Sequence, residues 1–203
     1  MSENSKLDPF YKVDQILSTE ERHELLDTYN NLEGKYAHQD YNLFDVTKKH
    51  FEPETLQHHA GIKALEKYAV SHDGVGGTYA HYFLHYGRDA FTKNHSDDDA
   101  AIGLTIVTLL ETTDNLVGGD TLITLPYTKE EHGLTRDSEP YVKRQLKGEL
   151  GKAPIGQRVI PRIVPMVEGD SVIYDRSLMH AVTQVESGHR VVLVSWFKTD
   201  NDV

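Results

Sequence analysis

The spacing of apolar residues changes about a third of the way along the chain. Before that point, apolar residues such as those in Leu25–Tyr29 recur with a helical period, which predicts that the first third is helical. We expect one helix to begin at Ser18 or Thr19, because either is a suitable N-cap residue. We expect a second helix to begin near Pro53, a residue favoured in the first turn, and to end before Gly74.

From residue 79 onward, short segments rich in β-branched and aromatic residues alternate with turn residues, which predicts strands. The predicted strands are Tyr79–Tyr86, Ala101–Leu110, Thr121–Leu125, Arg158–Val164, Ser171–Tyr174, Leu178–Val182 and Arg190–Phe197. Helices followed by many short strands indicate a β-sandwich or barrel with helices packed on its outside.

The chain has 203 residues, 38% of them hydrophobic, which suits one domain with one sizeable core. We expect a single domain over 1–203, with helical N-terminal support in 1–78 and a strand-rich core in 79–197. The stretch 127–156 is more polar than the segments around it, and we expect it to be an insertion or a lid.

Charge and residue usage exclude several classes of protein. Asp and Glu outnumber Lys and Arg by 32 to 21, for a net charge of −11, which disfavours nucleic-acid binding because phosphate groups require a basic face. The absence of Cys excludes disulfides, thiolate metal sites and a Cys nucleophile. The polar N-terminus and the lack of long apolar stretches predict a cytoplasmic protein that binds no membrane. Its oligomeric state is not predicted.

His95, Asp97 and His180 are the candidate metal ligands. His95 and Asp97 are separated by one residue, so both side chains project from one face of an extended backbone. His180 is the one strongly polar residue of an apolar strand and is the third candidate. Two His and one carboxylate form the facial triad of non-haem Fe(II) oxygenases, which leaves coordination positions open. The alternatives are that Asp97 belongs to an acidic turn and that His180 is a core histidine.

Arg190 follows His180 after a short loop and begins the last apolar strand. A guanidinium forms paired hydrogen bonds with a carboxylate, so Arg190 would fix the far end of a dicarboxylate whose other end binds the metal. This geometry requires the strand of His180 to end near Thr183 and the loop to run to about His189. Arg190 would then lie beside Val182. The alternative is a surface arginine.

The segment Tyr79–Phe197 resembles the 2-oxoglutarate- and Fe(II)-dependent dioxygenases of the prolyl 4-hydroxylase-like branch. An H-x-D step alone is a weak signal, whereas the ordered set that ends in His, Arg and Trp-Phe is specific. The matching positions are Tyr86-Gly87, Phe91, His95-x-Asp97, Leu104–Leu110, Gly118–Thr121, Val164-Pro165, Gly169–Tyr174, His180–Val182, Val185, Gly188–Arg190 and Trp196-Phe197.

The resemblance implies a mainly β fold with flanking α: a double-stranded β-helix (jelly roll, cupin-like) with N-terminal helices packed on one sheet. It implies that the catalytic and metal-binding residues are His95, Asp97 and His180, which hold Fe(II). It also implies that Arg190 binds the distal carboxylate of 2-oxoglutarate and that Tyr86 contacts 2-oxoglutarate or substrate.

The implied reaction hydroxylates an unactivated C–H bond while 2-oxoglutarate, the co-substrate, is converted to succinate and CO₂. Ascorbate is an optional reductant. The presence of Asp97 favours hydroxylation, because related halogenases have a small residue there. The analogy makes a prolyl residue of a protein or peptide the first choice of substrate, and a free amino acid or small metabolite the alternative.

One departure from the family concerns a tyrosine that often reaches the co-substrate. This chain has Leu109 and Leu110 in that strand, so we expect Thr105 or Thr108 to complete the pocket. Two other classes of protein stay open. A redox-inactive, metal-binding jelly-roll module would keep the three ligands but has no need of Arg190, and an interaction domain would use its histidines structurally.

Overall fold

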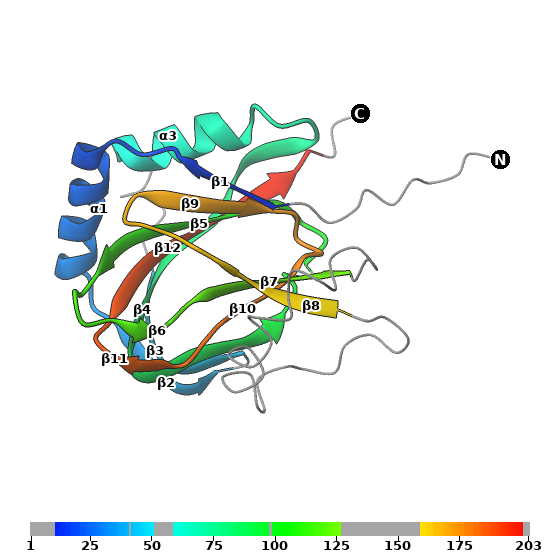
Figure 1. The fold of residues 1–203 in the computed structure, drawn as a ribbon. Coiled ribbons are helices and arrows are strands. Elements are labelled where there is room, and N and C mark those ends of the chain that lie inside the picture. The colour runs from blue at the N-terminus through cyan, green and yellow to red at the C-terminus, as the bar shows by residue number, and fades with distance from the viewer. Residues whose placement is uncertain (1–10, 41, 51–58, 98, 127–158, 201–203) are drawn as a thin grey trace.

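The computed structural model describes residues 11–40, 42–50, 59–97, 99–126 and 159–200 (Figure 1). Two helices are described, α1 (Thr19–Asn31) and α3 (Ala60–Ala69). The strands are β1 (Tyr11–Gln15), β2 (Lys35–Asp40), β3 (Leu43–His50), β4 (Val75–His95), β5 (Ile102–Thr112), β6 (Val117–Gly118), β7 (Thr121–Pro126), β8 (Val159–Val164), β9 (Asp170–Tyr174), β10 (Met179–Val182), β11 (Val185–Ser187) and β12 (Arg190–Thr199). The predicted insertion at 127–156 lies outside the described residues.

Antiparallel pairing joins ten of the strands into one sheet. Eight of them follow the order β1-β9-β5-β12-β4-β10-β7-β8, while β3 borders β4 and β2 borders β3. The short strands β6 and β11 pair separately. Figure 1 shows that the large sheet curls and that both helices lie outside it. The predicted arrangement of a mainly β core with N-terminal helices packed on one sheet is therefore confirmed.

The predicted start of the first helix is confirmed by its cap. The hydroxyl of Ser18 accepts a hydrogen bond from the Glu21 N–H, and the Ser18 N–H donates to the Glu21 carboxylate. This reciprocal capping box satisfies two N–H groups that have no partner within the helix. The residues around Pro53 lie outside the described part of the chain. Within the described part, the next helix after α1 begins at Ala60.

The expectation that the first third is helical throughout is wrong. β1 pairs with β9, with Tyr11 opposite Tyr174, and β2 and β3 form a hairpin that joins the sheet beside β4. β1 and β3 are stabilised by partners more than 30 residues away in the chain, with Val46 opposite Tyr86 as one example. Local apolar spacing carries no information about such distant partners, because strand preference depends on the neighbouring strand.

β12 shows how the sheet separates two cores. Val191, Leu193 and Phe197 face the helices and belong to the cluster that contains residues of α1 and α3. Val192 and Val194 alternate with them and belong to a second cluster inside the curled sheet. Because successive side chains of a strand point to opposite faces, the continuous apolar run of β12 is explained by burial on both sides.

β4 is 21 residues long and contains a bulge where it pairs with β3. Val46 of β3 pairs with Tyr86, whereas Phe44 pairs with Phe91, so extra residues are inserted into β4 between these positions. Asp89 lies in this insertion with a φ of 69°. Such a bulge bends the strand. The predicted strand end at Tyr86 is therefore too early, because the bent strand continues to His95.

Candidate metal centre and adjoining cavity

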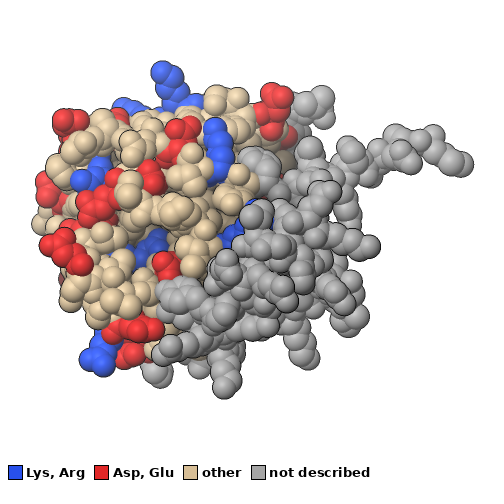
Figure 2. Space-filling model, in the orientation of Figure 1, with Lys and Arg blue, Asp and Glu red and all other residues tan. Residues whose placement is uncertain are grey.

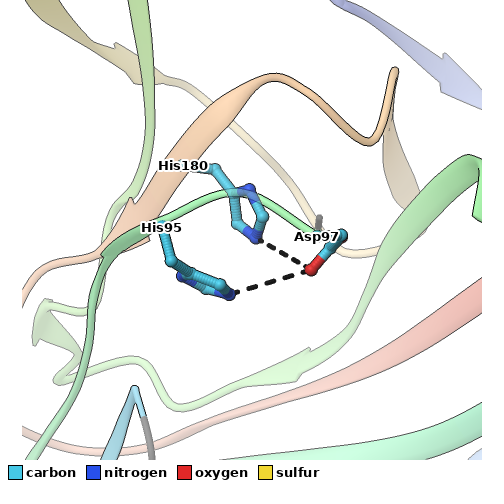
Figure 3. Close-up of side chains that lie close together, drawn as sticks. All are labelled: His95, Asp97 and His180. Atoms are coloured by element: carbon cyan, nitrogen blue, oxygen red, sulfur yellow. Dashed lines mark ion pairs between the residues drawn. The ribbon is translucent and has the colours of Figure 1, made fainter. Parts of the chain in front are cut away.

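The strand pairing places the two candidate histidine ligands side by side. His95 ends β4 and lies directly opposite His180 of β10, and their ring centroids are 4.2 Å apart. Asp97 follows β4 and points toward both rings (Figure 3). Its Oδ1 lies 3.8 Å from Nε2 of His95 and 3.9 Å from Nε2 of His180.

Backbone carbonyl groups orient both imidazole rings. Nδ1 of His95 lies 2.8 Å from the carbonyl oxygen of Lys93, and Nδ1 of His180 lies 3.0 Å from that of Leu178. A carbonyl oxygen only accepts, so each Nδ1 carries a hydrogen, and Nε2 is the nitrogen of each ring that is available to bind a metal. Metal-binding histidines are typically oriented in this way.

Asp97 is held by two further hydrogen bonds. Its side chain is 6% exposed, and Thr105 Oγ1 donates a 2.8 Å hydrogen bond to its Oδ2. Its main-chain N–H donates to the carbonyl oxygen of Arg176. The Thr105 contact occupies Oδ2 and leaves Oδ1 facing the two imidazole nitrogens.

The three free donor atoms fit a divalent transition-metal ion. The ligand atoms of His95, Asp97 and His180 all lie within 4.8 Å of one another. Burial, followed by the nearby ring of His95, lowers the pKa of His180 to about 4, so its ring is neutral near pH 7, as a metal ligand must be. Two imidazoles and one carboxylate suit iron in the facial-triad class of sites.

Arg190 is buried at the other end of the same cavity, with 3% of its surface exposed. Its guanidinium donates to the carbonyl oxygen of Gly119 and, over 3.2 Å, to the hydroxyl of Thr121. Both partners are neutral, no described carboxylate forms an ion pair with this guanidinium, and its Nε has no hydrogen-bond partner. Burial lowers the pKa of Arg190, whereas Tyr86 and Asp120 raise it. An arginine remains charged in this setting, so the cavity contains a buried cation that has no described carboxylate within ion-pair distance, although the more distant charge of Asp120 acts on it.

The strand register gives the distance between the two ends of the cavity. His180 of β10 pairs with Ile123 of β7, and Val182 pairs with Thr121. Thr121, and the guanidinium bonded to it, therefore lie two residues, or about 7 Å, along the strands from His180. That is the scale of a short dicarboxylate. The intervening walls are mainly apolar and include Leu84, Val107 and Val192.

The loop before Arg190 follows the predicted course with two differences. β10 ends at Val182, in agreement with the expected end near Thr183. The loop then contains the short strand β11, which pairs with β6 and was not predicted. Arg190 does not pair with Val182 directly. The two residues are linked through Thr121, which pairs with Val182 and bonds to Arg190.

Tyr86 lies in the cavity, but its hydroxyl already has a partner. The hydroxyl is 2.8 Å from Oγ1 of Thr92, and the guanidinium carbon of Arg190 lies 5.7 Å from the ring centroid. Burial raises the pKa of Tyr86, while Thr92 and Arg190 lower it. The ring therefore supports the cation, and contact with a co-substrate stays a prediction.

The expected replacements for the missing tyrosine serve other purposes. Thr105 binds Asp97, and Thr108 lies 2.7 Å from the hydroxyl of Ser171, away from the cavity. Thr121 instead places a hydroxyl beside Arg190, and the sequence interpretation missed it. Its place after the Gly118-Gly119 turn is the one sequence signal that pointed to it.

Two further tyrosines line the cavity near the candidate ligands. Burial, followed by the negative charge of Asp97, raises the pKa of both Tyr82 and Tyr174 well above the ordinary value. The ring of Tyr174 lies 4.6 Å from that of His180. The sequence analysis assigned neither residue to the site, although Tyr82 shares a strand face with Tyr86 at alternate positions.

Comparisons with known proteins identify the fold. No protein-family model and no curated protein matches the sequence. An oxidoreductase of the 2OG-Fe(II) oxygenase family from Burkholderia pseudomallei matches with 11% identity and a TM-score of 0.61, over 93% of this chain and 84% of that one. The viral collagen prolyl hydroxylase of Paramecium bursaria Chlorella virus-1, in a 2-oxoglutarate complex, matches with 16% identity and a TM-score of 0.56, over 94% and 96% of the two chains.

A third solved structure adds a metal-bound example. HygX from Streptomyces hygroscopicus, with nickel and 2-oxoglutarate bound, matches with 10% identity and a TM-score of 0.58, over 96% of this chain and 84% of that one. At these identities the matches establish the fold. The chain has the double-stranded β-helix fold of these oxygenases, as the sequence resemblance predicts.

Proposed function

We propose that this protein is a 2-oxoglutarate- and Fe(II)-dependent dioxygenase that hydroxylates an unactivated C–H bond and releases succinate and CO₂. The observation that carries the proposal is the pairing of two features in one cavity. The donors of His95, Asp97 and His180 converge at one end, and the buried cation of Arg190, whose Nε has no hydrogen-bond partner among the described residues, lies at the other. A metal-chelating dicarboxylate such as 2-oxoglutarate satisfies both ends.

Each residue contributes binding or orientation. His95, Asp97 and His180 hold Fe(II), which supplies the activation of dioxygen when it is bound. Arg190 and Thr121 bind the distal carboxylate and set how deeply the co-substrate enters. A buried guanidinium without a carboxylate in direct contact favours an anionic ligand strongly, because its own desolvation cost is already met in the folded state.

The apolar walls contribute by excluding water. Val107, Val192 and Val194 line the cavity between its two polar ends. They restrict water around the reacting groups, which strengthens the electrostatic contacts there and limits side reactions. A redox-inactive metal-binding module requires neither this apolar enclosure nor Arg190.

For the substrate we propose a prolyl residue of a protein or peptide. One structural neighbour is described as a collagen prolyl hydroxylase. Figure 2 shows acidic side chains spread over the described part of one face, and the net charge is −11, which suits a neutral or basic peptide. A free amino acid or small metabolite is the alternative, because the fold supports many substrates.

A panel assay tests the proposal. The Fe(II)-loaded protein is incubated in air with 2-oxoglutarate and with proline-containing peptides, matched alanine peptides or free amino acids. We expect succinate formation to rise with one class, together with a product heavier by one oxygen atom. Oxygen incorporation into the alanine peptides at an equal rate would argue against the prolyl assignment. The absence of succinate under every condition would favour a non-catalytic metal-binding module.

A further inference from the structure

Three aromatic rings form a continuous path from the cavity to the surface. Tyr82 lines the cavity beside the candidate ligands, and its ring centroid lies 5.1 Å from that of Trp196, with the rings nearly perpendicular. The ring of Trp196 lies 6.4 Å from that of Tyr79. Tyr79 is 42% exposed, so the path ends in solvent.

A bulge in β4 creates the outer step of this path. Trp196 pairs with Ala80, whereas the next residue, Phe197, pairs with Thr78. Tyr79 is therefore an extra residue without a partner on β12. In a regular strand, Tyr79 and Tyr82 would point to opposite faces, but a bulge re-aims a side chain. Both tyrosines consequently contact the same tryptophan.

Trp196 and Tyr79 differ in whether they are able to release a proton when they lose an electron. Nε1 of Trp196 is buried without a hydrogen-bond partner among the described residues, so a tryptophan that loses an electron there keeps its proton and remains a strong oxidant. The hydroxyl of Tyr79 lies at the surface, where it donates a 3.0 Å hydrogen bond to Asp99. Tyr79 is able to release its proton when it loses an electron. The radical is therefore most stable on Tyr79, the last residue of the path.

We propose that Tyr82, Trp196 and Tyr79 form an electron-transfer path that protects the metal centre when no substrate is bound. This inference rests on the proposed function, in which a metal-centred one-electron oxidant forms as dioxygen is consumed without a substrate C–H bond. That oxidant gains one electron through Tyr82 and Trp196. Tyr79 loses one electron and its phenol proton, which goes to solvent, and no bond to carbon forms or breaks.

The exposed end of the path gives a soluble reductant its point of access. A one-electron reductant such as ascorbate returns an electron to oxidised Tyr79, which regains a proton from solvent. The buried residues of the cavity are then spared from oxidation. The reductant therefore acts at the surface and does not need to enter the cavity.

Peptide mass spectrometry after controlled oxidation tests the path. In one arm, the Fe(II)-loaded protein is treated with hydrogen peroxide, which supplies an oxidant at the metal whether or not 2-oxoglutarate is a co-substrate. In the other arm, it receives 2-oxoglutarate in air without substrate. Where no reductant returns the electron, the Tyr79 radical combines with a second radical such as superoxide and leaves a stable product with added oxygen. We expect this product at Tyr79 to exceed that at Tyr68 in both arms, and ascorbate to suppress it. In Tyr79→Phe, we expect oxidation to move to Trp196 and Tyr82.

Tyr68 provides a matched control. Its hydroxyl also donates to a surface carboxylate, that of Asp14, over 3.2 Å, but its ring contacts His72 and lies outside the path. Tyr79 is the more exposed of the two, so the baseline is the ratio of their oxidation when the metal-free protein receives hydroxyl radicals generated in solution. The same ratio in the peroxide arm would overturn the path. Tyr68→Phe is expected to leave the oxidation of Trp196 unchanged. If the peroxide arm oxidises Tyr79 while 2-oxoglutarate is not consumed, the path stands and the proposed function fails.

Discussion

Thr105 donates a 2.8 Å hydrogen bond to Oδ2 of Asp97 inside the curled sheet. This contact leaves Oδ1 facing the two histidines. A carboxylate that is fixed by a neighbouring hydroxyl loses less conformational entropy when it binds a metal, and such supporting contacts are typical of metal sites. The relationship predicts that Thr105 contributes to metal affinity without touching the metal.

Replacement of Thr105 with Val keeps the shape of the side chain and removes its hydroxyl. We expect the affinity for Co(II) or Zn(II), measured by competition with a chelating dye, to fall by about 10-fold or more. Thr108→Val is the matched control, because Thr108 lies on the same strand and bonds to Ser171 away from the site. Equal affinities in the two variants would contradict a supporting role for Thr105.

Asp97→Ala removes the one carboxylate from the candidate ligand set. Two imidazoles bind Fe(II) more weakly than the full triad, and the related halogenases complete such a site with a halide, so in halide-free buffer we expect the variant to lose both bound iron and 2-oxoglutarate turnover. Iron content by elemental analysis after desalting is the measurement. Asp99→Asn is the control, because this nearby carboxylate lies outside the ligand set. Full iron retention in Asp97→Ala would remove Asp97 from the site.

Arg190→Ala removes the cation at the far end of the cavity and leaves the three ligands in place. We expect iron to be retained and 2-oxoglutarate binding to weaken by about 2–5 kcal/mol, which is about 30-fold or more. Anaerobic titration calorimetry of the metal-loaded protein measures this change. Arg88→Ala removes an arginine whose side chain is 80% exposed and is the control. Unchanged affinity in Arg190→Ala would rule out the assigned role.

A buried histidine outside the site predicts how stability depends on pH. His81 lies near the hydroxyls of Ser195 and Thr78, and burial lowers its pKa from 6.5 to about 4. Between these values the unfolded chain binds a proton that the folded chain does not, so stability falls as pH falls. The loss approaches about 3 kcal/mol by pH 4.

Urea denaturation of the metal-free protein at pH 7.5 and pH 5 checks this expectation. We expect His81→Gln to lose less stability than the wild type over this interval, because glutamine does not titrate. His72→Gln, at a histidine beyond the end of α3, controls for the substitution itself. A wild-type stability that rises on acidification would contradict the sign of the effect.

Residue spacing along the chain predicted the parts of the fold that depend on local chemistry. The N-cap was narrowed to Ser18 or Thr19, of which the structure has Ser18, because capping requires only neighbouring residues. The convergence of His95 and Asp97 was expected from strand alternation. The approach of His180 was expected from its isolation in an apolar strand, and the structure brings all three residues together. Their roles as ligands stay predictions.

Features that depend on long-range partners were not predictable. β1 and β3 look unremarkable in sequence and become strands through pairing with β9 and β4. Thr121 is one of several threonines, and only the strand register places it beside Arg190. The bulge that re-aims Tyr79 is likewise a property of two paired strands.

The most direct test of the central claim is succinate formation by the Fe(II)-loaded wild type with 2-oxoglutarate in air, measured beside the Zn(II)-loaded wild type and Asp97→Ala. The account predicts succinate from the iron-loaded wild type alone, because the reaction requires a redox-active metal held by this ligand set. Succinate formation by Asp97→Ala at the wild-type rate, or none from an iron-bound wild type across the full substrate panel, would contradict it.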